Sequence, residues 1–211
     1  MQKKINILLF SLVFALLLFL IINNNKIKVY TKKINYLDNT VVINIYSKKL
    51  SNNVFKEIEK IYKSSNDDIY TVTNKANNKL KKLKIKKYII NAQGNIIVGE
   101  HYNNDYYKVA LEDPNIEDGV FKVIKLKNKS VATLINPDHT IKNGTRYFND
   151  VTYKSINVIS NDLLKSKKVL DKLYKLDIDE GKKYINNLKD VDAIWYLNDD
   201  SIVTSNGVNK M

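Results

Sequence analysis

The 211-residue sequence contains no cysteine, only two histidines and two prolines, and a single arginine, Arg146. The absence of cysteine excludes disulfides, thiolate metal sites, iron–sulfur clusters, cysteine nucleophiles and an acylated lipoprotein cysteine. With six glycines, the chain has little material for a glycine-rich phosphate-binding loop. Two histidines are also too few for a histidine-rich metal site.

Lysine supplies nearly all of the positive charge, and the formal net charge is +13. Nucleic acid is not an expected partner, because arginine is the preferred reader of bases and no recognition motif is present. The densest basic run is KLKKLKIKK at Lys79–Lys87. This run is typical of a solvated helix end that leads into a strand. Contact with an anionic lipid or wall polymer is the alternative.

A long apolar run, Ile5–Ile22, lies near the N-terminus, and only Asn6 and Ser11 interrupt it. Because about 20 apolar residues of helix span a bilayer, we predict a transmembrane signal anchor within residues 1–29. No small-residue cleavage site follows the run, so a cleaved signal peptide is the weaker alternative. A buried core helix is excluded because the run has no polar face. We expect a single-pass protein of the cell membrane, with residues 30–211 forming one extracytoplasmic domain.

The hydrophobic patterns predict an α+β fold, with a mixed, largely antiparallel sheet packed with helices. Strands are expected at 40–46, 87–91, 95–98, 106–112, 121–126, 130–134, 153–159, 193–197 and 201–204. Helices are expected at 51–63, 74–83, 162–176 and 178–188. Turns at Gln93-Gly94, Lys127–Lys129 and Asn198–Asp200 are expected to join neighbouring strands as hairpins.

A series of short segments follows the predicted elements in a characteristic order. It comprises TVVINIY at 40–46, YIINAQGN at 88–95, YKVALEDP at 107–114, SVAT at 130–133, NGTRY at 143–147 and the helix region at 155–176. From about residue 36 to the C-terminus this series resembles the bacterial FAD:protein FMN transferases, or ApbE family. The resemblance implies a protein that binds FAD and magnesium and attaches FMN to a threonine or serine of a target protein. It also implies that Asn91, Gly94 and Thr133 are remnants of a flavin pocket.

The metal site that the resemblance implies is altered in this sequence. In an alignment without gaps, the family's metal-binding aspartate falls on Lys167, and its threonine partner falls on Asp171. A lysine puts a positive charge where the cation would lie. Asp162 and Ser166 have the same four-residue spacing, which brings two side chains to one helix face. A shifted register with this metal pair is therefore the weaker alternative.

Other family features are also missing from the sequence. The family's histidine falls on Asn149, and Gln93 replaces the first of two paired glycines. No segment resembles S-D-G-A-F-D-x-T or D-L-G-G-I-A-K-G-Y-A, and residues 63–73 stand where the family places much of its flavin pocket. His101 and His139 match no family ligand, so we expect both at the surface.

We therefore predict a shortened ApbE-like domain that lacks transferase activity and acts as a binding or scaffold module, or is a relic. No catalytic residue, metal ligand or cofactor is assigned. The first alternative is an active transferase, for which FAD and magnesium would be the cofactors. The second is a surface protein that binds anionic polymers through Lys79–Lys87. The expected partners are the membrane and a flavinylated membrane protein or a full-length flavin transferase.

Overall fold

A computed structural model describes residues 26–116, 119–148 and 152–208 of the chain. Within these ranges, eight strands form one sheet in the order β1-β2-β3-β4-β7-β10-β11-β12, and each pairing in it is antiparallel. The strands are β1 (Lys28–Tyr36), β2 (Asn39–Ser47), β3 (Tyr88–Ala92), β4 (Asn95–Val98), β7 (Lys129–Ile135), β10 (Tyr153–Ser160), β11 (Asp192–Leu197) and β12 (Ile202–Thr204). Two hairpins stand apart, β5 (Tyr107–Glu112) with β6 (Val120–Leu126), and β8 (His139–Lys142) with β9 (Thr145–Phe148).

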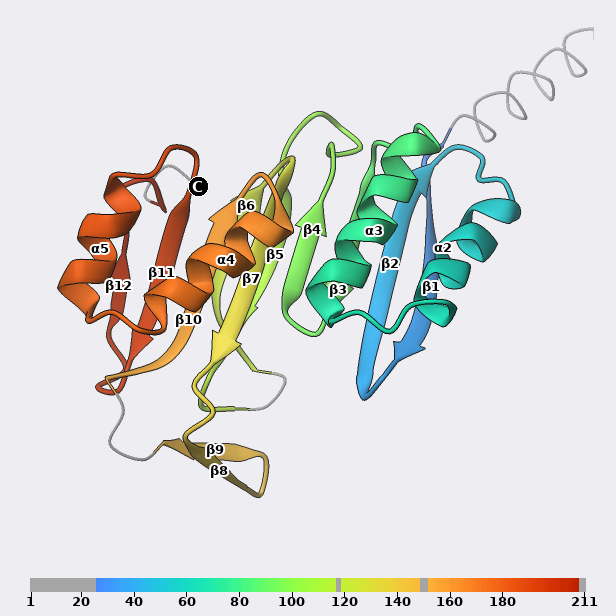
Figure 1. Cartoon of the computed structure of the whole chain (residues 1–211). Helices are drawn as coiled ribbons and strands as arrows, with labels where there is room; N and C mark the ends of the chain where they lie inside the picture. The colour runs from blue at the N-terminus through green and yellow to red at the C-terminus, as the bar shows by residue number, and fades with distance from the viewer. Residues whose placement is uncertain (1–25, 117–118, 149–151, 209–211) are drawn as a thin grey trace, which may run out of the picture.

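The helices of the described ranges all lie on one face of the large sheet (Figure 1). They are α2 (Asn53–Lys63), α3 (Ile69–Lys82), α4 (Leu163–Leu173) and α5 (Ile178–Asn186). Three of them begin at an aspartate, Asp68, Asp162 or Asp177, whose carboxylate accepts a hydrogen bond from a backbone N–H of the first turn. Such caps satisfy donors that the helix itself leaves free. These side chains therefore fix where α3, α4 and α5 start.

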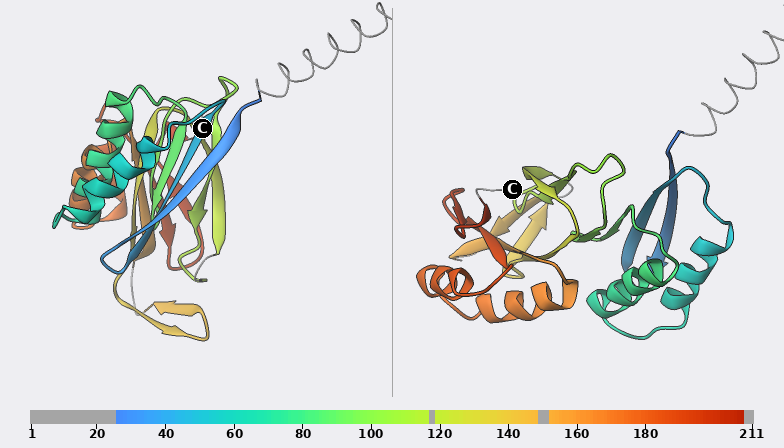
Figure 2. Two further views of the ribbon diagram at one scale, coloured as in Figure 1. Left: turned by 90° about the vertical axis from the view of Figure 1, so that its right-hand side faces the viewer. Right: turned by 90° about the horizontal axis from the view of Figure 1, so that it is seen from above.

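The large sheet is covered on both faces near its centre. The helices bury one face, and the β5–β6 hairpin packs against the opposite face (Figure 2). All eight residues of β10 and all four of β4 are buried as a result. Strands buried on both faces carry apolar side chains almost continuously rather than alternately. This arrangement explains the sequence INVI within β10 and NIIV in β4.

The hairpin predicted over Lys127–Lys129 is wrong. β6 pairs with β5, whereas β7 pairs with β4 and β10, so the two strands belong to different sheets. Asn128 adopts a left-handed backbone conformation (φ 51°), and its N–H donates to the carbonyl of Gly99 at 3.1 Å. The turn thus carries the chain from the small sheet into the large one. There β7 buries Val131 and Ala132 completely.

The α+β class and the largely antiparallel sheet are confirmed. The strand β1 and the β8–β9 hairpin were not predicted, and α3 begins at Ile69, five residues before the predicted start. The transmembrane anchor predicted at Ile5–Ile22 lies outside the described residues. In the part of the chain that the structure describes, no helix is long and apolar enough to cross a bilayer.

The buried tyrosine of α2 makes the fold sensitive to alkaline pH. Tyr62 is 2% exposed, and burial raises its pKa to about 12. An unfolded tyrosine ionises at about pH 10. The stability that depends on protonated Tyr62 is therefore present below pH 10 and is lost as pH rises through about 12.

We expect Tyr62→Phe to flatten the fall in the free energy of unfolding between about pH 10 and pH 12, measured by urea denaturation. Tyr106→Phe is the control, because that ring is 53% exposed. If the free energy of unfolding falls equally steeply with pH in the wild type and in Tyr62→Phe, Tyr62 is not the group that causes the fall.

Candidate functional site

A cavity of about 390 Å³ lies on the face of the large sheet that carries the β5–β6 hairpin. Residues of β2, β4, β5 and β7 and the turn between β3 and β4 contribute to its wall. The polar part of the wall comprises Asp38, Thr40, Asn91, Gln93, Glu112 and Thr133. Pockets of this size are large enough for a small-molecule ligand.

The turn at the edge of the cavity is held by hydrogen bonds to neighbouring strands. Gln93 and Gly94 both have positive φ, 52° and 83°, and the N–H of Gly94 donates to Oδ1 of Asn91 at 3.1 Å. Oγ1 of Thr133 lies 3.0 Å from the carbonyl of Gly94 and 2.9 Å from Oδ1 of Asn157. The structure thus brings together Asn91, Gly94 and Thr133, the three residues predicted to be flavin-pocket remnants.

A second polar cluster lies on the helix side of the sheet and meets the first at Thr133. The hydroxyl of Tyr70 donates to the carbonyl of Thr133 at 3.4 Å. Nζ of Lys167 lies 5.1 Å from the centre of the Tyr70 ring, and it contacts Oδ1 and Oδ2 of Asp171 at 2.5 and 2.6 Å. The residues on which the family's metal-ligand positions fall, Lys167 and Asp171, therefore form an ion pair along α4.

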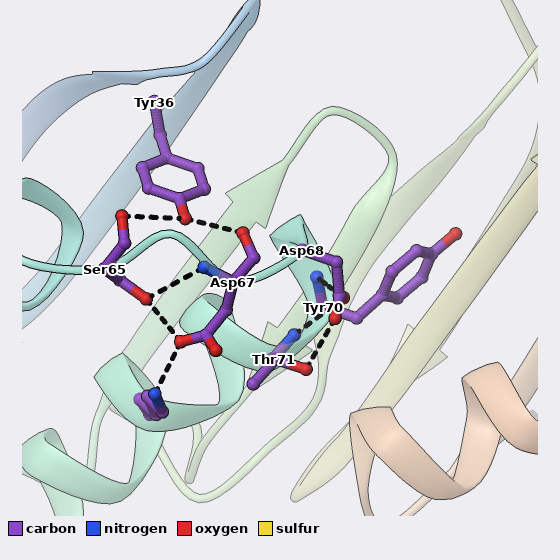
Figure 3. Close-up of polar contacts among 7 residues, drawn as sticks. Tyr36, Ser65, Asp67, Asp68, Tyr70 and Thr71 are labelled. Atoms are coloured by element: carbon purple, nitrogen blue, oxygen red, sulfur yellow. Dashed lines mark hydrogen bonds and ion pairs between the residues drawn. The ribbon is translucent and has the colours of Figure 1, made fainter.

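Tyr70 is placed in this cluster by the segment that precedes α3. The hydroxyl of Tyr36 donates to the carbonyl of Asp67 at 2.6 Å, and Asp68 caps the helix by accepting from the N–H of Tyr70 at 2.9 Å. From the first turn, the ring of Tyr70 extends away from this loop toward β7 and α4 (Figure 3). Residues 63–73 therefore supply a helix start and one side chain of the site.

Burial raises the pKa of Tyr70, and the negative charge of Asp171 raises it further. The hydroxyl is thus protonated at neutral pH and can donate to Thr133. Sequence reasoning missed Tyr70, although Asp68 is a recognisable N-cap two residues earlier. It also missed Glu112, which gave no signal beyond its place at the end of a predicted strand.

The alternative metal pair is engaged in other contacts. Asp162 caps α4 by accepting from the N–H of Lys165 at 2.9 Å. Ser166 is fully buried, and its Oγ lies 2.8 Å from Oγ of Ser160 and 3.3 Å from Oγ of Ser130. The Ser166 hydroxyl is therefore held within a buried cluster of serines, whereas the carboxylate of Asp162 is used as the helix cap.

The two histidines are half-buried and pack locally. The ring of His101 lies 4.2 Å from that of Tyr102, centre to centre. Nδ1 of His139 lies 2.5 Å from the carbonyl oxygen of Asn136. Asn149, the predicted equivalent of the family's histidine, lies outside the described residues.

Two lysines of the basic run Lys79–Lys87 make polar contacts within the protein. Nζ of Lys79 pairs with Glu57 at 2.7 Å, and Nζ of Lys87 donates to the carbonyl of Tyr102 at 3.1 Å. The run covers the C-terminal end of α3 and the approach to β3, as expected of a solvated helix end. Its binding to anionic polymers stays a prediction.

The sequence from Tyr70 in the site to the core strand β11 matches one family model. The ApbE family model covers residues 70–195, more than half of the chain. The chain belongs to the ApbE family.

Solved ApbE structures have the same fold as this chain. A flavin transferase ApbE from Vibrio cholerae matches with a TM-score of 0.69 and 8% identity, over 88% of this chain and 99% of that chain. The apo flavinyl transferase ApbE of Pseudomonas stutzeri matches with a TM-score of 0.65 and 10% identity, over 85% of this chain and 95% of that chain. An ApbE protein from Thermotoga maritima matches with a TM-score of 0.66 and 12% identity, over 87% of this chain and 99% of that chain. No curated protein sequence matches the chain.

The residues at the implied ApbE metal site do not suit a divalent cation. Magnesium requires oxygen ligands, but the ammonium group of Lys167 contacts both oxygens of Asp171. The pair is partly exposed, with side-chain exposures of 33% and 58%, so it contributes little to stability. The pair matters because it places the positive charge of Lys167 at the implied metal position. Among the described residues, no group of three or more histidine, cysteine or acidic side chains could hold a metal.

Asp68 should be required to start α3 and to position Tyr70. We expect Asp68→Ala to lower the free energy of unfolding by about 1 kcal/mol, because two backbone donors lose their acceptor. Urea denaturation measures this change. Asp105→Ala, in an exposed loop, is the control and should have almost no effect. An unchanged stability of Asp68→Ala would show that the cap does not fix the helix start.

Restoring the ApbE pair should create a metal site. We expect the wild type to give no heat of binding with magnesium in isothermal titration, and Lys167→Asp combined with Asp171→Thr to give a saturable one. The reason is that the double variant presents a carboxylate and a hydroxyl one helical turn apart. Lys168→Ala removes one unit of positive charge from an exposed position of the same helix and is the control. Saturable magnesium binding to the wild type would show that the Lys167–Asp171 ion pair does not exclude a divalent cation.

Proposed function

We propose that this chain is a membrane-anchored ApbE-family protein that lacks FAD:protein FMN transferase activity and acts as a binding or scaffold module. The observation that carries the proposal is the ion pair between Lys167 and Asp171, with Nζ within 2.6 Å of both carboxylate oxygens. These are the positions at which the resemblance places the metal ligands of active relatives.

The chemistry of FMN transfer explains why this ion pair matters. Cleaving the pyrophosphate of FAD builds negative charge on phosphate oxygens, and a divalent ion stabilises that charge. At this site the ammonium of Lys167 repels a cation, and Asp171 is already neutralised by its partner. The neighbouring Tyr70 is a neutral donor that is directed at Thr133. The ammonium of Lys167 is paired with Asp171, so it offers a bound pyrophosphate less charge than a divalent ion would.

The sequence supports the same proposal independently of the ion pair. Gln93 stands in place of a family glycine, and the two motifs named above are missing. Residues 63–73 form a capped helix start where the resemblance expects much of the flavin pocket.

The location and the partners belong to the same proposal. The apolar run Ile5–Ile22 would hold the protein in the membrane as a single-pass anchor, with residues 30–211 outside the cytoplasm. In that place the domain would meet a flavinylated membrane protein or a full-length flavin transferase.

An active transferase with Asp162 and Ser166 as metal pair has less support. Ser166 is fully buried among serine hydroxyls, so a metal bound there would have to displace those contacts. The carboxylate of Asp162 is used as a helix cap, and removing a cap is costly by itself.

The proposal predicts that the chain performs no flavin transfer. The full-length protein in detergent micelles is incubated with FAD, magnesium and an acceptor protein of an active family member, and covalent flavin is read by in-gel fluorescence. We expect no fluorescent acceptor, whereas an active flavin transferase in a parallel reaction labels it. A flavin-labelled acceptor in the reaction with this chain would overturn the proposal.

A further inference from the structure

The described wall of the cavity beside Gly94 holds acidic side chains and no basic ones. Two carboxylates, Asp38 and Glu112, line it, and none of its described lining residues is a lysine, arginine or histidine. The apolar part of the wall is formed by Val42, Ile96 and Leu111 among others. A phosphate-bearing ligand would therefore meet like charge at this surface.

Glu112 is held in place by an arginine that lies behind it. Nη2 of Arg146 donates to Oε1 of Glu112 at 2.7 Å, and Nη1 donates to the carbonyl of Asp113 at 3.2 Å. The side chain of Arg146 is only 8% exposed and does not line the cavity. The other carboxylate oxygen, Oε2, lies 3.8 Å from the position of a Cβ built on Gly94. An acceptor oxygen thus lies beside the glycine turn.

The glycine N–H groups of the wall are already used. Gly94 donates to Oδ1 of Asn91 at 3.1 Å, and Gly119 donates to the carbonyl of Ile116 at 3.0 Å. Free backbone N–H groups and cationic side chains are the groups that bind phosphate. With neither available from these glycines or from the lining side chains, the cavity is suited to a ligand that donates hydrogen bonds and carries no negative charge.

We propose that this cavity binds the uncharged flavin, riboflavin, in preference to FMN and FAD. The inference rests on the proposed function, because without a bound divalent ion the phosphates would face the charge of Asp38 and no cationic side chain of the wall, since Arg146 lies outside it and is paired with Glu112. The ring N–H and the ribityl hydroxyls of riboflavin are donors that match these carboxylates. The apolar wall suits the flavin ring, and a volume of about 390 Å³ falls within the range of roughly 300–1,000 Å³ for small-molecule sites.

The test is a comparison of three flavins that share one ring and differ in phosphate charge. The full-length protein in detergent micelles is titrated with riboflavin, FMN and FAD, with and without magnesium, and flavin fluorescence anisotropy is recorded. We expect riboflavin to bind at least about tenfold more tightly than FMN or FAD, with no effect of magnesium. Equal or tighter binding of FMN or FAD, or no binding of riboflavin, would overturn the inference.

Two substitutions locate the binding to this cavity. Ala110 lines the cavity from an exposed position of β5, so Ala110→Trp should fill it and weaken riboflavin binding at least about tenfold. Lys108→Trp places the same ring two residues away on the same face of β5, outside the wall, and should leave binding unchanged. Equal effects of the two variants would refute the location.

A third substitution tests the electrostatic cause. Asp38 is exposed, and Asp38→Asn removes one charge from the wall. We expect the variant to narrow the affinity gap between riboflavin and FMN, and an unchanged gap would contradict the electrostatic argument. Riboflavin has no phosphate to transfer, so its binding is independent of transferase activity. Covalent labelling of an acceptor by FAD would overturn the proposed function, whereas tight binding of FAD without labelling would overturn only this inference.

Discussion

Burial on both faces of β4, β10 and the first half of β7 is the constraint on which the rest of the structure depends. The helices occupy one face of these strands and the β5–β6 hairpin occupies the other. Any solvent-accessible polar site near the centre of the sheet must therefore lie where a strand ends, or where the helices or the β5–β6 hairpin leave part of a face uncovered. Thr133, close to the end of β7, is such a point. Its carbonyl meets Tyr70 from the helix side, while its hydroxyl meets the carbonyl of Gly94 at the cavity.

The charge distribution around Thr133 is the basis of our proposal that this chain lacks transferase activity. On the helix side, a lysine ammonium supplies the only positive charge that contacts Asp171 in the described residues. On the cavity side, the arginine that could meet a phosphate is turned behind Glu112 instead. In both places the cationic side chain is paired with a carboxylate of the protein. We propose on this basis that the framework retains a ligand-sized cavity without the electrostatics of phosphate transfer.

Much of the fold could be predicted from the sequence because its strongest signals are local. The strand β4 and the helices α4 and α5 have clear hydrophobic patterns, and their predicted ranges overlap the observed ones closely. The pairing of β6 with β5 rather than β7 could not be read locally, since it depends on which face each strand buries. The edge strand β1 was missed because only Ile34 and Tyr36 of its nine residues are buried, which leaves a weak pattern.

The site was only partly predictable for the same reason. Asn91, Gly94 and Thr133 were named through resemblance to a family, and the structure places them at one cavity. Asp38 comes from the turn between β1 and β2 and Glu112 from the end of β5, and neither stands in a motif that indicates a shared wall. Their proximity is a product of the topology. The register of α4 decides whether Lys167 or Asp162 represents the family's aspartate, and sequence alone left both registers open.

The most direct test of the central claim is a crystal of the protein grown with FAD and manganese. Manganese substitutes for magnesium and gives an anomalous signal that identifies it independently of the protein atoms. The account predicts no anomalous peak between α3 and α4, with the ammonium of Lys167 still in contact with Asp171. A manganese peak within about 2.2 Å of an Asp171 oxygen, with Lys167 displaced, would contradict it.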